Sequence, residues 1–157
     1  MGDGHGYKSC VPANALASLD RINTAIVNSK SLDDMLDAVL GDILDIFDCE
    51  RAWVLQSRKP GADSVHMLAE RYRPGFEGAL ALHGEFPIWE GLDAFLKINL
   101  NSNGPVRFDP LSGAPDFVHG PMLARFNIQS QMVMALRPLN ENPWFVGIHH
   151  CREEYDL

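Results

Sequence analysis

The first third of the chain carries apolar residues at a helical period. Between Pro12 and Asn28 they recur at intervals of four, three and four positions, a narrow seam of the kind that two helices share. The seam consists of Ala15, Leu19, Ile22 and Ile26. After Ser31, which has Asp34 three positions later as in a capping box, the apolar positions form a broader face that extends to Phe47. The pattern predicts two consecutive amphipathic helices.

Beyond residue 50 the apolar positions favour β-strands. We expect a strand in each of five segments: 50–57, 65–73, 105–109, 128–137 and 144–151. Turn-forming residues join the first two strands into one hairpin and the last two into another. The segments between the hairpins are less regular, with a helix expected at 89–100 and irregular connections at 74–87 and 114–126.

The order of these elements predicts an α+β domain. We expect a central antiparallel sheet of five to six strands, with helices packed on one face and with loops and short helices forming a pocket on the other. A chain of 157 residues is long enough for one domain with one core. We expect residues 1–12 to be a disordered N-terminal segment and residues 13–157 to form the domain.

Charge and hydropathy narrow the possible partners. The formal net charge is −8, whereas proteins that bind nucleic acid usually display a basic patch. No stretch approaches the roughly 18 apolar residues of a membrane span, and the N-terminus lacks the basic and apolar regions of a signal peptide. We therefore expect a cytoplasmic protein that has no nucleic-acid partner and no membrane span in this segment.

Three cysteines, Cys10, Cys49 and Cys151, are widely spaced and form no CxxC pair, which predicts free thiols in a reducing compartment. The sequence His149-His150-Cys151 invites a metal site. However, consecutive residues of a strand point to opposite faces, so the two histidines cannot both bind one metal from a regular strand. Nucleophilic catalysis would need a base beside Cys49 or Cys151, and a buried structural thiol is the favoured interpretation of each.

Alternation along 128–137 separates two faces of a strand. Met132 and Met134 share the face that we expect to lie under the helices. Gln129 and Gln131 share the other face, where two amides would be costly to bury without partners. These glutamines indicate either a polar cavity or an exposed strand face. Trp53 is expected in the core.

Several segments resemble GAF domains, the small-molecule sensing modules of bacterial signal-transduction proteins. SLDDMLDAVLGDILDIFDCERAWVLQ is similar to the second helix and first strand of the family. GPVRFDPLSGAP, FNIQSQMVMALRP and PWFVGIHHC resemble GAF domains of sensory histidine kinases and related regulators. The likeness covers the chain from Ala13 onward. GAF domains usually continue into a C-terminal helix that joins an output domain, and this sequence ends before such a helix.

FNIQSQMVMALRP and PWFVGIHHC are also similar to the phytochrome subset of GAF domains. That likeness puts His150 on the first of two pocket histidines, His119 on the histidine before the chromophore position, and Gly120 on the chromophore cysteine itself. A glycine cannot form a thioether, so covalent bilin is not expected and the cofactor is left unknown. The NKxxD motif of cyclic-nucleotide-binding GAF domains and the cysteine set of the methionine sulfoxide reductases are missing.

The resemblance implies a non-enzymatic sensor whose ligand, an unknown small molecule, lies between the sheet and residues 74–126. The expected polar contacts come from His119, Gln129, Gln131 and His150, with Arg107 pairing with an anionic group and Trp89 forming a wall. A homodimer formed through the N-terminal seam would relay the signal to a histidine kinase, diguanylate cyclase or phosphodiesterase in the same full-length chain. Two alternatives stay open: a ligand-free dimerization spacer, and a redox or catalytic domain that uses Cys49 or Cys151.

Overall fold

The computed structural model describes residues 13–57, 64–82, 85–87, 90–108, 123–139 and 141–152. The longer α-helices are α1 (Ala13–Asn28), α2 (Leu32–Ile46) and α3 (Glu90–Asn101), and residues 123–125 form a further helical turn. A short 3₁₀ helix, η1, spans Ala79–Leu82. Six strands complete the described elements: β1 (Arg51–Ser57), β2 (Ser64–Tyr72), β3 (Glu85–Pro87), β4 (Val106–Phe108), β5 (Ser130–Leu136) and β6 (Trp144–His150).

Helix α2 begins and ends where local chemistry predicts. The hydroxyl of Ser31 accepts a hydrogen bond from the backbone N–H of Asp34 at 3.1 Å, which confirms the expected cap of α2. Phe47 closes the helix by donating its N–H to the carbonyl of Ile43, and Asp48 then turns the chain with a φ of 46°. Both expected helices are therefore confirmed.

All neighbouring strands pair antiparallel, in the order β3-β2-β1-β6-β5-β4. The five strand segments expected from the sequence are confirmed. The sheet has six strands, within the expected range of five to six. The additional strand, β3, has three residues and pairs only with β2, at the edge. Its segment was expected to be irregular, because three residues are too few to show a period.

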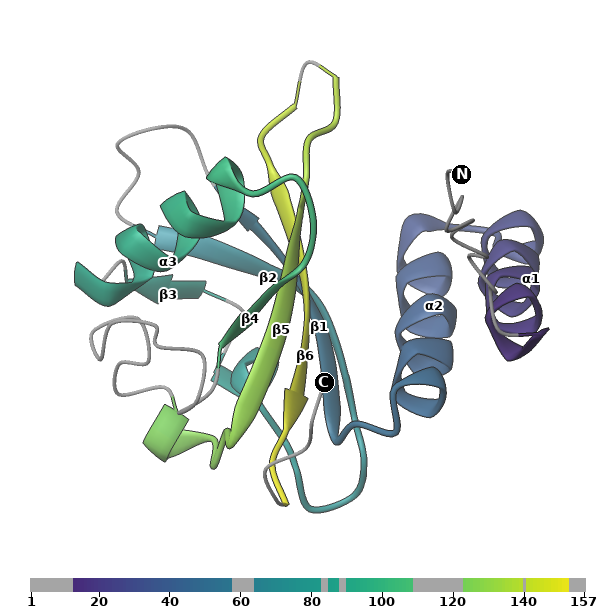
Figure 1. The fold of residues 1–157 in the computed structure, drawn as a ribbon, viewed down its shortest axis with the longest axis horizontal. Coiled ribbons are helices and arrows are strands. Elements are labelled where there is room, and N and C mark those ends of the chain that lie inside the picture. The colour runs from purple at the N-terminus through teal and green to yellow at the C-terminus, as the bar shows by residue number, and fades with distance from the viewer. Residues whose placement is uncertain are drawn as a thin grey trace, which may run out of the picture.

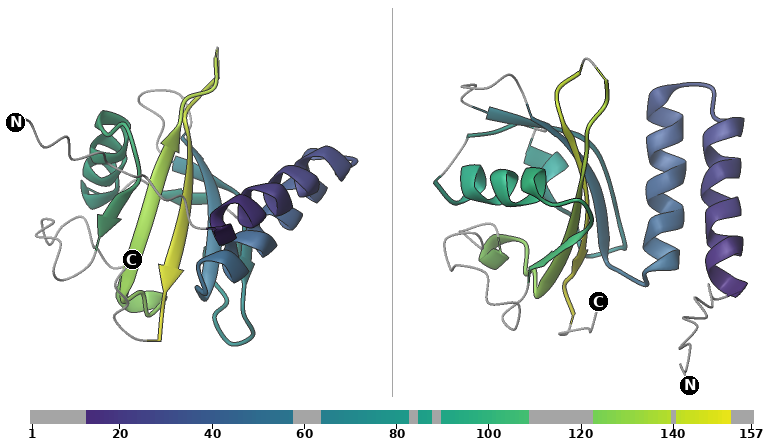
Figure 2. Two further views of the ribbon diagram at one scale, coloured as in Figure 1. Left: turned by 45° about the vertical axis from the view of Figure 1, so that its right-hand side comes forward. Right: turned by 45° about the horizontal axis from the view of Figure 1, so that its top comes forward.

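The sheet carries helices on both faces (Figure 1). Helix α2 packs on one face, called here the outer face, and α1 packs on the far side of α2, whereas α3 lies on the opposite or inner face (Figure 2). The expected arrangement is confirmed: α1 and α2 cover one face, and α3, which belongs to the segment 74–126 expected over the pocket, lies on the other. Helix α3 packs there through an apolar stripe of its own, Leu92, Phe95 and Leu96, which needs a sheet to cover it. No described helix is long and apolar enough to cross a membrane.

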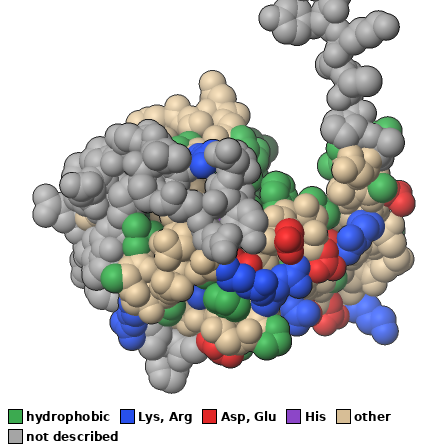
Figure 3. Space-filling view, turned by 60° about the horizontal axis from the view of Figure 1, so that its bottom comes forward, with side chains coloured by type: hydrophobic (Ala, Val, Ile, Leu, Met, Phe, Trp, Pro, Cys, Tyr) green, Lys and Arg blue, Asp and Glu red, His purple; other side chains and the backbone are tan. Residues whose placement is uncertain are grey.

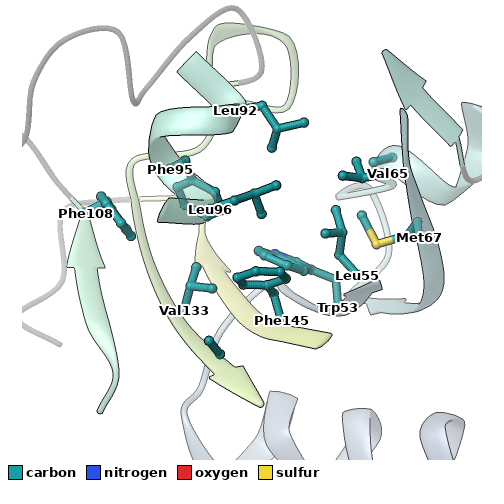
Figure 4. Close-up of a cluster of buried hydrophobic side chains, with 12 residues drawn as sticks. Trp53, Leu55, Val65, Met67, Leu92, Phe95, Leu96, Phe108, Val133 and Phe145 are labelled. Carbon is teal, nitrogen blue, oxygen red and sulfur yellow. The ribbon is translucent and has the colours of Figure 1, made fainter. Parts of the chain in front are cut away.

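Two apolar clusters fill the spaces on either side of the sheet. The inner cluster lies between the sheet and α3 (Figure 4), and it consists of Trp53, Leu55, Val65, Met67, Ala79, Leu92, Phe95, Leu96, Phe108, Val133, Ala135 and Phe145. The outer cluster lies under α2, and it consists of Leu36, Leu40, Leu44, Cys49, Ala52, Val54 and Ile148. The expected core position of Trp53 is confirmed.

Met132 packs against the outer cluster, as expected. Met134 does not, since it is 42% exposed. The difference arises because α2 packs mainly against β1 and β2, and the far end of β5 extends beyond this helix.

Charged side chains of both signs surround the groove between α2 and β2. Arg71 pairs with Asp37 at 3.2 Å, and Arg73 pairs with Asp45 at 3.5 Å. Figure 3 shows basic side chains next to acidic ones on the face of the molecule that it presents. Exposed pairs of this kind contribute little to stability, because water screens them.

Candidate functional site

Strand alternation brings five polar or amphipathic side chains together on the inner face. Register pairs Arg51 of β1 with His149 of β6, and His149 with Gln131 of β5. Trp53 follows two positions after Arg51, and Glu70 of β2 reaches Arg51 from the other side. All five side chains are buried. We call this set, Arg51, Trp53, Glu70, Gln131 and His149, the inner polar cluster.

Arg51 is the most connected member of the inner polar cluster. Its Nε donates to the carbonyl of Phe76 at 3.0 Å and lies 3.7 Å from Oε1 of Glu70. Its Nη2 donates to the carbonyls of Glu77 and Phe126, at 3.2 and 3.4 Å. The guanidinium also lies over the ring of Phe126, 5.4 Å from its centroid. Arg51 therefore ties two connecting segments to the sheet.

Glu70 compensates the charge of Arg51 and holds the start of η1. Its two carboxylate oxygens accept the backbone N–H groups of Ala79 and Leu80, at 3.0 and 3.1 Å. Burial raises the pKa of Glu70, while the backbone hydrogen bonds and Arg51 act in the opposite direction. The approach is so close that a Cβ on Gly78 would lie 2.0 Å from Oε1 of Glu70. A larger residue at position 78 would force the buried side chains of Glu70 and Arg51 to move.

His149 lies between two obligate hydrogen-bond donors. Nε1 of Trp53 donates to Nε2 of His149 at 2.8 Å, and Nη1 of Arg51 lies 3.1 Å from Nδ1. Burial first, and then the charge of Arg51 and the neighbouring His150, hold the pKa of His149 well below its ordinary value of 6.5. The ring is therefore neutral and has a single acceptor nitrogen. Trp53 and Arg51 therefore compete for this one acceptor, and the tautomer of the ring decides which of the two contacts is a hydrogen bond.

This environment predicts a pH dependence of stability. The depressed pKa of His149 means that its contribution to folding is complete above pH 6.5 and is lost as the pH falls from 6.5 through the pKa of the folded state. Burial also lowers the pKa of His150, with the same sign. Urea unfolding at a series of pH values measures this dependence. Below pH 6.5 we expect the free energy of unfolding to fall more steeply with pH in the wild type and in His150→Asn than in His149→Asn. Equal slopes in all three proteins would contradict this assignment.

Gln131 is the member of the cluster on β5. The residue is 6% exposed, and its amide is not among the fully buried side-chain atoms of the described residues that lack a hydrogen-bond partner. The register places it between His149 on β6 and Phe108 on β4.

The structure does not bring the other sequence-predicted contacts together with Gln131. Gln129 lies before β5, half-buried, and its amide donates to Oδ1 of Asn127 at 3.1 Å. Arg107 pairs in register with Met132, so it lies on the outer face. His119, Gly120 and Trp89 lie outside the described residues.

His150 also lies on the outer face, and its expected position opposite Gln129 and Gln131 is wrong. The register pairs Ser130 with His150 and Gln131 with His149, which puts His149 on the face of Gln131. Nδ1 of His150 lies instead 3.9 Å from Oε2 of Glu50, and both side chains are buried. The prediction that the two histidines occupy opposite faces is confirmed, but the inner one is His149.

The two described cysteines have the environment of structural thiols. Cys49 and Cys151 are free and buried. Burial raises the pKa of Cys49 to about 12 and raises the pKa of Cys151, so both stay protonated at neutral pH. A nucleophilic thiol needs the opposite shift. Among the described residues, no three His, Cys, Asp or Glu side chains are arranged to hold a metal ion.

Sequence reasoning missed Arg51, Glu70 and His149 as members of one site. The segments of Arg51 and Glu70 were correctly predicted to be strands, but a charged side chain in a strand is normally expected to face the solvent. A signal was available in Gly147, which pairs in register with Trp53. A glycine inside a strand often marks a close approach by another group. Here that group is the indole of Trp53, whose Nε1 binds His149.

No protein-family model matches the chain, and no curated protein matches it. Solved structures do. The phycocyanobilin-bound GAF domain from a cyanobacterial phytochrome superimposes with a TM-score of 0.69 at 19% identity, covering 94% of this chain and 85% of that chain. The far-red absorbing dark state of a protein with bound biliverdin IXa gives a TM-score of 0.71 at 15% identity, covering 89% and 86%.

A third similar structure is the GAF domain from a phosphoenolpyruvate-protein phosphotransferase of Coxiella burnetii. It superimposes with a TM-score of 0.63 at 15% identity, covering 88% of this chain and 78% of that chain. Identities this low establish the fold alone. The chain therefore has the GAF-domain fold, as the resemblance in sequence indicated.

Proposed function

We propose that this domain is a sensory module that binds a small molecule on the inner face of its sheet and relays the bound state to an output domain. The single observation that supports this most strongly is the set of buried polar side chains on the inner face, where Gln131 lies in register beside His149 and both adjoin the inner apolar cluster. Small-molecule sites combine apolar walls with a few convergent polar groups of this kind.

The proposed ligand contacts are Gln131 and His149. His119 and Trp89 stay proposed contacts on the strength of the sequence resemblance alone. Arg107, His150 and Gln129 are removed from the set, because the first two lie on the outer face and the third already has a partner. Arg51 and Glu70 position the site, since their polar groups are engaged by backbone and by one another.

Native mass spectrometry and absorbance of the protein purified from its own organism test this proposal. We expect a bound small molecule that leaves on denaturation, and a lower occupancy in a Gln131→Leu variant purified in the same way. The matched control is Gln129→Leu, which removes the neighbouring amide and should keep the ligand. Protein that carries no bound mass would overturn the sensory proposal.

A ligand-free spacer is the second candidate, and one observation favours it. The inner cluster already holds twelve buried apolar residues from the sheet, η1 and α3, including Trp53 and Phe145, so much of the space above the sheet is filled. In that case the domain would act only through its helices. Native protein without ligand, together with an unchanged output on mutation of Gln131, would favour the spacer over the sensor.

We further propose that the module carries no chemistry of its own and works in the cytoplasm. The raised pKa values of Cys49 and Cys151 support the first statement, because protonated buried thiols are poor nucleophiles. Their free state supports the second. The proposed output is a histidine kinase, diguanylate cyclase or phosphodiesterase in the same full-length chain.

The relay is proposed to run through a homodimer formed by α1. The expected apolar seam of this helix is divided in the structure: Ala15 and Ile22 are half-buried, whereas Leu19 and Ile26 are exposed. Leu19 and Ile26 form an outer stripe with two neighbouring side chains, Leu16 and Val27. The four side chains of this stripe are 47% to 71% exposed. A stripe of this kind on one helix suits the same stripe of a second copy.

Charge placed on the outer stripe should separate the dimer. We expect Leu19→Asp with Val27→Asp to shift the sedimentation coefficient from dimer to monomer while leaving the fold intact, because both side chains are exposed. Thr24→Asp adds a charge to an exposed position away from the stripe and should stay dimeric. A wild-type protein that sediments as a monomer at high concentration would contradict the proposed relay.

A further inference from the structure

Arg73 lies where three parts of the fold meet: the end of β2, the C-terminal end of α2 and the segment that leads to η1. Its backbone N–H donates to the carbonyl of Glu50 at 2.9 Å. Its Nε donates to the carbonyl of Cys49 and its Nη2 to the carbonyl of Leu44, each at 3.1 Å. Leu44 belongs to the last turn of α2, where the carbonyl groups have no partners within the helix. Arg73 therefore fixes the end of α2 to the end of β2.

A tight turn carries the chain from Arg73 towards the inner face. The N–H of Phe76 donates to the carbonyl of Arg73 at 3.0 Å, and Gly75 between them has a φ of 87°. A proline at the second position and a glycine with positive φ at the third are the features of a type II turn, whose backbone has little freedom. Directly beyond the turn, the carbonyls of Phe76 and Glu77 accept hydrogen bonds from Arg51. A displacement of the Arg51 guanidinium is therefore passed to Arg73 through stiff backbone.

Two ion pairs continue this connection from Arg73 to α1. Oδ1 of Asp45 lies 3.5 Å from Nη2 of Arg73, and Oδ2 of the same carboxylate lies 3.3 Å from Nη2 of Arg21. Arg21 belongs to α1, the helix that carries the outer stripe, and it also pairs with Asp42 of α2. Because one carboxylate serves two guanidinium groups, a movement towards one of them weakens its attraction to the other. Movement of Arg73 therefore alters how α1 is held against α2.

We infer that Arg73 couples the inner polar cluster to α1, through the turn at residues 73–76 on one side and through Asp45 and Arg21 on the other. Arg73 is a positioning residue in this scheme, because it acts through Arg51 and Asp45. The side chains of Arg73 and Asp45 are 31% and 56% exposed, and ion pairs of this kind add little to stability. The inference rests on the proposed sensory function and adds to it the route from the inner face to the proposed dimer helix.

The indole of Trp53 is a reporter inside the inner polar cluster. Its Nε1 donates to His149, which also lies 3.1 Å from Arg51, so a shift of Arg51 changes the surroundings of that N–H. Exchange of the indole N–H with water is measured by NMR of ¹⁵N-labelled protein, and the resonance is identified by its loss in Trp53→Phe. Trp144 provides an internal reference, because it lies on the outer face at the opposite end of β6 from His149.

Arg21→Gln changes the far end of the route at an exposed side chain. We expect it to change the exchange rate of the Trp53 indole N–H by about twofold or more, the lower end of the effects of mutations along a coupling network. In an Arg73→Gln background the same substitution should leave that rate unchanged. The matched control background is Arg71→Gln, because Arg71 lies on the same strand and pairs with Asp37 of α2 but takes no part in the route. The response should persist there.

The comparison of backgrounds separates coupling from a structural role. A residue that only stabilises the fold changes the exchange rate by itself, whereas its loss does not remove the response to Arg21→Gln. If Arg73→Gln fails to fold, Asp45→Ala replaces it, because that substitution cuts the route and leaves Arg73 its carbonyl partners.

Three results would each overturn the inference: a Trp53 indole that does not respond to Arg21→Gln, a response that survives the loss of Arg73 or Asp45, and a response that Arg71→Gln abolishes as well. None of these measurements uses a ligand. Their outcome is therefore independent of the mass spectrometry that tests the sensory function, and the failure of one proposal is distinguished from the failure of the other.

Discussion

Arg51→Met is expected to reduce the free energy of unfolding by about 3–5 kcal/mol, which is the usual cost of removing one partner from a buried ion pair. The substitution keeps much of the side-chain length but leaves the Glu70 carboxylate without its cation. It also frees three backbone carbonyls, those of Phe76, Glu77 and Phe126. Urea denaturation monitored by circular dichroism measures the loss.

The matched control is Arg71→Met. Arg71 also pairs with a carboxylate, Asp37 at 3.2 Å, but the two side chains are 49% and 60% exposed. We expect that control to change stability by about 1 kcal/mol or less. Adding Glu70→Gln to Arg51→Met should recover part of the loss, because the uncompensated charge is then gone. An Arg51→Met protein as stable as the control would show that the inner ion pair does not hold the connecting segments.

Local patterns in the sequence were sufficient to predict most of the fold. Three features could each be predicted from a few neighbouring residues, and all three are confirmed: the Ser31 cap, the broad apolar face of α2 and the alternation of β5. Strand β3 was not predictable in this way, because it exists only through its pairing with β2. The face taken by α3 was expected only through the family resemblance, which put residues 74–126 over the pocket, because the pattern of an amphipathic helix does not say which side of a sheet it covers.

The candidate site was predicted less well, and the reason is register. Alternation correctly separated His149 from His150, but it could not say which of them faces inward. That choice is made by the pairing of β6 with β1, where Arg51 lies opposite His149. Gln131 was found because two amides in an apolar strand are anomalous by themselves. Arg51 and Glu70 lie on different strands, and neither is anomalous until the fold buries both.

Gly147→Ala is expected to cost about 3 kcal/mol or more, at the upper end of the usual range for overpacked cores. A Cβ at this position would lie 2.1 Å from Cζ2 of Trp53 and 2.4 Å from Cε2. The indole would have to move, and its movement would break the hydrogen bond from Nε1 to His149 and disturb the inner cluster. Urea denaturation should report the loss, and tryptophan emission should shift to the red.

Gly104→Ala is the control for this substitution, because no atom lies within 4 Å of the position that its Cβ would take. We expect it to be nearly neutral. A double-mutant cycle tests the cause: in a Trp53→Leu background the smaller side chain leaves room for the methyl group, so Gly147→Ala should cost much less there. An equal cost in both backgrounds would mean that the strand backbone, and not the indole, requires glycine. The position of Trp53, and with it the N–H that it donates to Nε2 of His149, would then need another explanation.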